Sequence, residues 1–318
     1  MNKKKVLFTI LGIAIIAFLI YKISPSKLIE TLKNFNFNYL PLIIITLLLI
    51  YILAGVNTWV LCWPFRKISL IKVIKYNFFT LFFAVILPGK LADLLLLHFL
   101  KKDRISISQS TIVVFFDKII SLFLKIILGL IGAIFILKQF NFLFIGIPLI
   151  TLLIVCLSLL IINSKRIRDF IKDKILKRYS SIWKGFSKNL RNYQKEYKIY
   201  LGYNVLITLI KDFFEALLFF LLFLSFGQYI DPIKVFFVFF LLSIIILLAF
   251  PIGISGLGVR EALAIVVFST INVDSAVVFN SLILRISLIY LINFVTFIKY
   301  HDELNLLKKG KIWQKLKL

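Results

Sequence analysis

The chain has 318 residues, of which 61% are apolar and 16% aromatic, and its mean hydropathy is +1.01. Values so far above the average of soluble domains exclude an ordinary globular enzyme and predict a polytopic helical membrane protein. His98 and His301 are far apart, and Cys62 and Cys156 lie in or beside expected helices. We therefore expect neither a metal site nor a disulfide framework.

Apolar runs long enough to approach the roughly 20 residues that cross a bilayer occur six times. They lie at about 6–23, 39–61, 111–137, 142–162, 201–224 and 276–298. The first run follows MNKKK without a small-residue cleavage site, so it is expected to be an uncleaved signal anchor. The predicted fold class is an all-α polytopic membrane protein with about six full spans plus two re-entrant helical hairpins.

Two stretches, PGKLAD at 88–93 and PIGISGLGVRE at 251–261, interrupt apolar sequence with a helix breaker, glycines, a base and an acid. In a bilayer such segments survive only where protein or a water-filled cavity covers them. They are expected to form the tips of hairpins at 76–100 and 233–270. The expected hairpin backbone residues are Pro88, Gly89, Pro251, Gly253, Gly256 and Gly258. The GISGLG glycines also suit a close crossing of two helices.

The distribution of Lys and Arg predicts the orientation, because cytoplasmic loops retain basic residues during insertion. Segment 163–200 alone carries 12 bases against three acids. The inner face collects about 28 bases in all and the outer face about five. Both termini are therefore expected in the cytoplasm, with the protein in the cell membrane. The basic segment is expected to set topology and to contact anionic lipid, with no nucleic-acid partner.

This orientation makes the first hairpin open inward and the second outward, as in transporters built from inverted repeats. The spacing also favours a repeat: Asp93 is followed 24 residues later by Asp117, and Glu261 is followed 24 residues later by Arg285. A serine begins the helix after each hairpin, Ser108 in the first half and Ser275 in the second. Each hydroxyl is expected to cap its helix.

A single domain over 1–318 is therefore expected. Its parts are a first half at 1–162, a basic cytoplasmic segment at 163–200, a second half at 201–300 and a cytoplasmic tail at 301–318.

Eleven ionisable side chains are expected at membrane depth, where each costs roughly 2.5 to 3.5 kcal/mol unless it pairs or meets water. The acids are Asp93, Asp117, Asp212, Glu215 and Glu261, and the bases are Lys90, Lys118, Lys125, Lys211, Arg260 and Arg285. The one surplus base favours anions. Helical spacing places Asp117, Ser121 and Lys125 on one stripe, and Lys211 and Glu215 on another. These stripes are either ion pairs that join helices or part of a substrate path; for Lys211, Asp212 and Glu215 both interpretations stay open.

These motifs, in this order, resemble the lysylphosphatidylglycerol synthase transmembrane region over most of the chain. FPIGISGLGVREA is similar to the second signature of that family, and Gly256, Gly258, Arg260 and Glu261 match it well. The first signature is similar too, but with substitutions. Lys90 and Asp93 stand where the family usually has arginine and glutamate, Asp117 and Lys118 where it has glutamate and arginine, and Ser121 where an aspartate is common.

The resemblance implies a flippase-like domain that moves a lipid with a polar or anionic headgroup between leaflets. The residues expected to bind it are Lys90, Asp93, Asp117, Lys118, Arg260, Glu261 and Arg285. No cofactor and no catalytic motif is expected, and the soluble lysyltransferase domain of some family members would not fit after the last span. Two alternatives stay open: an integral-membrane lipid-modifying enzyme with Asp93 or Glu261 as base, and a membrane partner of a glycosyltransferase.

Overall fold

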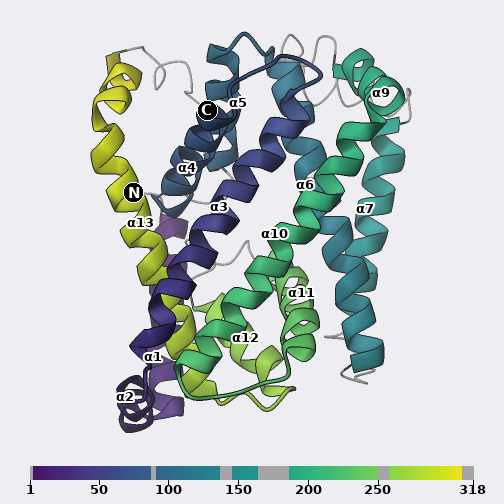
Figure 1. Cartoon of the computed structure of the whole chain (residues 1–318). Coiled ribbons are helices and arrows are strands. Elements are labelled where there is room, and N and C mark those ends of the chain that lie inside the picture. The colour runs from purple at the N-terminus through teal and green to yellow at the C-terminus, as the bar shows by residue number, and fades with distance from the viewer. Residues whose placement is uncertain (1–2, 87–90, 137–144, 164–185, 250–257, 310–318) are drawn as a thin grey trace.

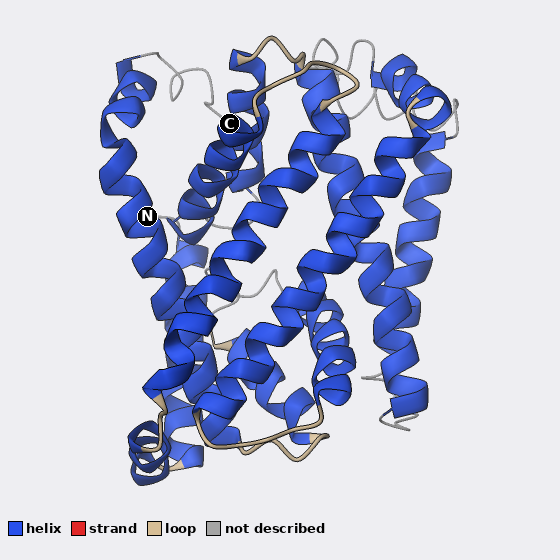
Figure 2. Cartoon of the chain, viewed as in Figure 1, coloured by secondary structure: helices blue, strands red, loops and turns tan. Residues whose placement is uncertain are grey.

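The structure is a computed structural model that describes residues 3–86, 91–136, 145–163, 186–249 and 258–309. Every regular element in these ranges is a helix (Figure 2). The first half contains α1 (Lys3–Ile23), α2 (Pro25–Lys33), α3 (Leu40–Cys62), α4 (Leu70–Ile86), α5 (Leu91–Lys102), α6 (Ile107–Ile131) and α7 (Ile147–Asn163). The second contains α9 (Phe186–Glu196), α10 (Lys198–Ser225), α11 (Pro232–Ala249), α12 (Val259–Ser269) and α13 (Ser275–Lys309). The predicted all-α class is confirmed.

Two described segments are long and apolar enough to cross a membrane alone, Phe37–Cys62 and Ser275–Thr296. A bent pair, Ile10–Ile23 with Pro25–Lys33, meets the same criterion together and turns by 78° between its helices. Pro25 explains this turn because a proline ring clashes with a continuing helix and lacks an N–H group. α10 is 28 residues long but carries three ionisable side chains in its middle. The count of six spans stays a prediction.

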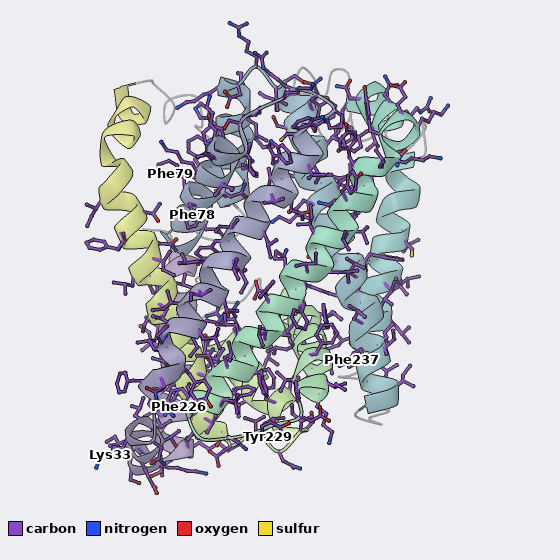
Figure 3. All side chains as sticks on the ribbon, viewed as in Figure 1. Lys33, Phe78, Phe79, Phe226, Tyr229 and Phe237 are labelled. Carbon is purple, nitrogen blue, oxygen red and sulfur yellow. The ribbon has the colours of Figure 1, made fainter. Side chains whose placement is uncertain are left out.

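Large apolar side chains face outward on several helices, as expected where lipid replaces water as the solvent. Ile13 and Phe18 of α1, Leu153 of α7, and Leu291 and Phe294 of α13 are all more than half exposed. Tyr229 and Lys33 lie at the same end of the bundle (Figure 3), where an aromatic ring and a long basic side chain suit the membrane interface. The outer surface therefore supports a membrane location.

Two apolar cores lie at different levels of α10. One joins the ends of α3, α5 and α9 through Leu61, Leu100 and Tyr193, and Leu201 of α10 packs against it. The other joins α10, α11 and α12 and begins on α10 at Ala216. The stretch of α10 between Leu201 and Ala216 is therefore the part that lies outside both cores.

α6 and α11, which both contact α10, pack closely against each other. A Cβ added at Gly129 of α6 would lie 2.7 Å from a side-chain carbon of Ile244 in α11, and one at Gly132 would lie 2.6 Å from Phe237. Small residues let helix backbones approach in lipid. α6 and the π-helical turn Gly132–Ile136 after it therefore lie close to α11, and a side chain at Gly132 would require Phe237 to shift.

The helix caps differ from those predicted. α6 is capped by Ser106, whose hydroxyl accepts from the Gln109 backbone N–H at 3.2 Å while the Gln109 side chain accepts from the Ser106 N–H at 3.0 Å. Ser108 lies inside the first turn and accepts from Asn189 at 3.2 Å. Ahead of α13, the Asp274 carboxylate accepts from the Ala276 N–H at 2.8 Å. The predictions of Ser108 and Ser275 as caps were wrong because both serines lie within the first turn of their helices, and Ser106 and Asp274 before them accept from the free N–H groups.

Candidate functional site

The two predicted hairpins correspond to two pairs of consecutive helices. α4 and α5 lie towards the end of the bundle that also holds α9, and α11 and α12 lie towards the opposite end (Figure 1). The tips themselves fall outside the described residues, and with them Pro88, Gly89, Lys90, Pro251, Gly253 and Gly256. Asp93 belongs to α5, but its side chain is not among those described. The inverted relation of the hairpins stays a prediction.

The second signature is described from Gly258 onward, where it begins α12. The Glu261 carboxylate accepts from the Gly258 N–H at 2.6 Å and from the Arg260 guanidinium at 2.9 Å. Glu261 is buried and Arg260 is partly exposed. One carboxylate therefore both closes the first turn of α12 and holds the guanidinium beside it.

Gly258 also meets α1. Its φ is +85°, a conformation that favours glycine, and a Cβ there would lie 2.5 Å from the carbonyl oxygen of Gly12. The predicted role of Gly258 in shaping the hairpin backbone agrees with this geometry, as does the alternative of a close crossing. The two interpretations apply to the same residue, because the tight turn and the close helix contact coincide.

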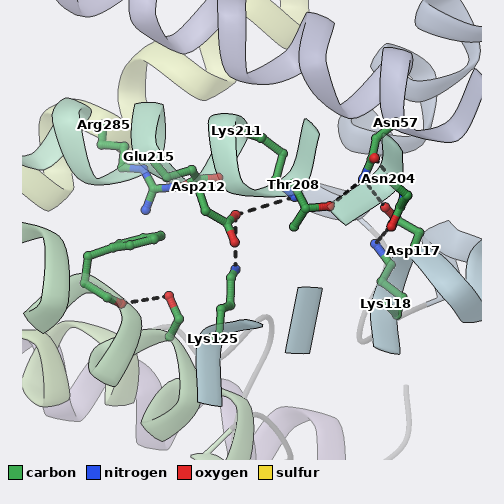
Figure 4. A network of polar contacts seen from close by, with 12 residues as sticks. Asn57, Asp117, Lys118, Lys125, Asn204, Thr208, Lys211, Asp212, Glu215 and Arg285 are labelled. Atoms are coloured by element: carbon green, nitrogen blue, oxygen red, sulfur yellow. Dashed lines mark hydrogen bonds and ion pairs between the residues drawn. The ribbon is translucent and has the colours of Figure 1, made fainter. Parts of the chain in front are cut away.

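A row of polar side chains follows one face of α10 between the two apolar cores (Figure 4). Asn204, Thr208, Asp212 and Glu215 recur at intervals of three or four, the spacing that aligns side chains on a helix. Each of them contacts a polar group from another helix. The row therefore joins α3, α6, α10 and α13 inside the bundle.

At one end of the row, amide groups form a hydrogen-bonded cluster. Asn57 of α3 donates to the Asp117 carboxylate at 2.7 Å and to the Thr208 hydroxyl at 3.0 Å. Its own carbonyl accepts from Asn204 at 2.6 Å. Lys118 lies 3.5 Å from Asp117. Because Asn57 is fully buried and uses both ends of its amide, it fixes the orientation of the Asp117 carboxylate.

In the middle of the row, two lysines from different helices approach one carboxylate. The Nζ atom of Lys125 on α6 lies 3.8 Å from Asp212, and that of Lys211 lies 3.6 Å from the same oxygen. Asp212 is fully buried, and neither of its oxygens accepts a hydrogen bond. We refer to Lys125, Asp212 and Lys211 as the lysine triad. It is held by charge alone.

At the far end, Arg285 of α13 donates to Glu215 of α10 at 2.7 Å. The guanidinium also lies over the Phe219 ring, 5.1 Å from its centroid. Both members of the pair are about one-fifth exposed. Arg285 thus has a carboxylate and an aromatic face as partners, which suits the planar guanidinium.

The structure brings some predicted site residues together and leaves others apart. Asp117 contacts Lys118, and Arg260 contacts Glu261. Arg285 pairs with Glu215, not with Glu261, which lies 24 residues earlier. The predicted stripes do meet, because Lys125 of the α6 stripe reaches α10 beside Lys211. Whether these residues bind a substrate stays a prediction.

Sequence reasoning missed the uncharged part of the row, namely Asn57, Asn204 and Thr208. The signal was present, since Asn204 and Thr208 continue the α10 stripe towards its N-terminus with the same spacing. Asn57 is an amide within an otherwise apolar run. No group of three or more His, Cys, Asp or Glu side chains suited to a metal ion occurs among the residues described.

Helices that expose apolar surface and enclose a charged row define the class: an integral membrane protein with an internal polar site. The chain belongs to the family described as the lysylphosphatidylglycerol synthase TM region, whose model matches residues 6–295. The predicted family is therefore confirmed, and with it a membrane protein involved in lipid handling. No curated protein and no solved structure matches the chain.

Proposed function

We propose that this protein is a lipid flippase that moves a lipid with a polar or anionic headgroup between the leaflets. The observation that carries the proposal is the charged row on α10 (Figure 4). Intramembrane charges in a bundle are costly, and they mark pathways for polar groups more often than structural contacts. In this proposal the headgroup follows the row while its acyl chains stay in lipid.

The two helical pairs supply the proposed movement. α4 with α5 and α11 with α12 form oppositely oriented re-entrant hairpins of an inverted repeat, and they open alternately to the two sides. Their opposite placement in the bundle supports this. The proposed headgroup contacts are Lys90, Asp93, Asp117, Lys118, Arg260, Glu261 and Arg285. The single unit of 1–318 then works as one transport domain.

The proposed orientation places both termini on the cytoplasmic side of the cell membrane. Lys101 and Lys102 end α5, and Arg104 follows it, at the end of the bundle that holds α9. At the opposite end, Lys27 is paired with Asp274 and therefore contributes little net charge. This asymmetry supports the assignment, because Lys and Arg accumulate on the cytoplasmic side.

Leaflet exchange in liposomes tests the function. Purified protein is expected to accelerate dithionite quenching of inner-leaflet fluorescent lipid for at least one of phosphatidylglycerol, aminoacylated phosphatidylglycerol and a polyprenyl phosphate. Arg285→Gln removes a charge from the row and is expected to lower the exchange rate about tenfold, equivalent to about 1.4 kcal/mol in the barrier. The matched control is Arg104→Gln, an exposed arginine outside the row, which is expected to exchange lipid at the wild-type rate.

Absence of exchange for all three lipids would overturn the transport proposal. Lipid analysis of a deletion strain then separates the alternatives. A lipid present but confined to the inner leaflet supports transport, whereas a lipid that vanishes altogether supports a lipid-modifying enzyme. A cellular function that survives Arg260→Ala and Glu261→Ala but is lost when the basic segment at 163–200 is neutralised supports a membrane partner of a glycosyltransferase.

A further inference from the structure

The lysine triad differs from the other charged contacts of the membrane interior in its ratio of bases to acids. Three contacts among the described residues match one cation with one carboxylate. They are Lys118 with Asp117 at 3.5 Å, Arg260 with Glu261 at 2.9 Å, and Arg285 with Glu215 at 2.7 Å. In the triad, Lys125 and Lys211 share Asp212. Two ammonium groups and one carboxylate leave one positive charge unmatched.

The geometry leaves the ammonium groups available to another acceptor. Both Nζ atoms lie beyond hydrogen-bonding distance of Asp212, at 3.8 and 3.6 Å, and each can donate three hydrogen bonds. The side chains of Lys125 and Lys211 are 23% and 16% exposed, whereas Asp212 is fully buried. The lysines are therefore the accessible members of the triad. Lys125 also lies 5.7 Å from the centroid of Phe239, a contact that does not neutralise its charge.

The position of the triad makes an unmatched charge costly. Lys211 and Asp212 are the fourteenth and fifteenth residues of α10, which has 28 residues, so they lie at its midpoint. A charge at the centre of a bilayer costs roughly 2.5 to 3.5 kcal/mol on insertion scales. A ligand that brings negative charge and several acceptor oxygens would offset that cost. A phosphate group has both properties.

We propose that Lys125 and Lys211 together bind the phosphate of an anionic lipid headgroup, and that Asp212 holds the two ammonium groups in place when no lipid is bound. This site deepens the proposed function, on which its lipid assignment rests. Lysine is a compact point charge without the geometric demand of a guanidinium. The site therefore selects net negative charge and accepts headgroups of different shape.

A binding titration tests the site directly. The full chain is purified in dodecyl maltoside, which contains no phosphate, and titrated with fluorescent phosphatidylglycerol. Lys125→Gln and Lys211→Gln are each expected to weaken binding about tenfold, the loss of one charge-assisted hydrogen bond. Asp212→Asn is expected to tighten binding several-fold because the competing carboxylate is gone. The matched control is Lys234→Gln, an exposed lysine on α11, which is expected to bind like the wild type.

The opposite signs distinguish a binding site from a structural ion triad. If Asp212→Asn weakens binding together with the lysine variants, or if none of the three changes it, the site is disproved. Lys211→Arg keeps the charge and is expected to bind within about threefold of the wild type, whereas Lys211→Gln is not. Equal binding by the two variants would also disprove the site. Size-exclusion and thermal-unfolding profiles check that each variant is folded.

Two further ligands identify the source of the phosphate. Diacylglycerol with the same acyl chains is expected not to compete, and inorganic phosphate is expected to compete only at concentrations far above those of the lipid. Competition by inorganic phosphate at equal concentration would overturn the lipid assignment. Leaflet exchange keeps this inference separate from the proposed function. If the wild type binds lipid but does not exchange it between leaflets, transport is disproved and the binding site is still supported. If lipid is exchanged but none of the triad variants changes binding, the site is disproved and transport is still supported.

Discussion

The two parts of the polar row on α10 satisfy their buried groups in different ways. Asn57 exchanges three hydrogen bonds with Asp117, Thr208 and Asn204 across three helices. Asp212, two turns further along α10, accepts no hydrogen bond although two lysines surround it. The first part is joined by hydrogen bonds, although the Asn204 side-chain oxygen accepts none. The second part is a set of charges within ion-pair distance and without hydrogen bonds between them.

This difference gives the two parts of the row different effects on the packing of their helices. A buried hydrogen-bonded network fixes the positions of its helices, since hydrogen bonds require a preferred distance and direction. A buried carboxylate between two ammonium groups holds its helices in place less firmly, because charge attraction depends weakly on direction. The amide cluster around Asn57 therefore suits a rigid joint between α3, α6 and α10. The lysine triad suits a place where the lysines can exchange Asp212 for the phosphate of the proposed ligand.

The strongest test of this difference removes both lysines of the triad. Lys211→Met alone leaves Asp212 paired with Lys125, so the free energy of unfolding is expected to fall by less than about 1 kcal/mol. Lys125→Met combined with Lys211→Met leaves a fully buried carboxylate without a cation, and the fall is expected to reach about 4 kcal/mol. Unfolding in mixed detergent and dodecyl sulfate micelles measures both values. Additive effects of the two substitutions would show that the lysines do not share the carboxylate.

A smaller effect is expected at the amide cluster. Asn57→Leu removes three hydrogen bonds and leaves the buried Asn204 and Thr208 without that partner, which is expected to cost about 2 kcal/mol of unfolding free energy. The control is Thr46→Val on the same helix, because the Thr46 hydroxyl bonds only the Leu42 carbonyl of its own helix. That control is expected to cost less than about 1 kcal/mol. Equal losses for the two variants would mean that the cluster does not join the helices.

The same contrast explains what the sequence could predict. Apolar runs and composition predict the helical class, and the spacing of charges on α6 and α10 indicates which residues share a face of each helix. Partner choice could not be predicted, because Glu215 and Glu261 offer the same chemistry to Arg285 and only the packing of α10 against α13 decides between them. Asn57 was missed for a related reason. The hydrogen-bond partners of a single amide in an apolar helix can be identified only when its neighbours in space are known.

The smallest effect is expected at the outer pair of Lys27 and Asp274, which has similar chemistry without burial. The Lys27 Nζ atom lies 2.5 Å from a carboxylate oxygen of Asp274, closer than either lysine of the triad lies to Asp212. The side chains of Lys27 and Asp274 are nevertheless 49% and 38% exposed. Burial raises the pKa of Asp274, but the hydrogen bonds from Lys27 and the Ala276 N–H outweigh it and lower the pKa overall. The pair therefore stabilises the fold at neutral pH and loses its contribution as the pH falls through this lowered pKa, below about pH 4.

Lys27→Met is accordingly expected to cost less than about 1 kcal/mol at pH 7, because solvent screens an exposed pair. As the pH falls through the lowered pKa of Asp274, the cost of the substitution is expected to shrink, since the carboxylate takes up a proton and the pair loses its attraction. Unfolding of the wild type and the variant at pH 7 and at a series of acidic pH values, with and without 0.5 M salt, measures this difference. A loss at pH 7 as large as that of the double lysine variant would mean that distance, not burial, sets the strength of charge pairs in this protein. The contrast between the hydrogen-bonded part of the row and the lysine triad would then lose its physical basis.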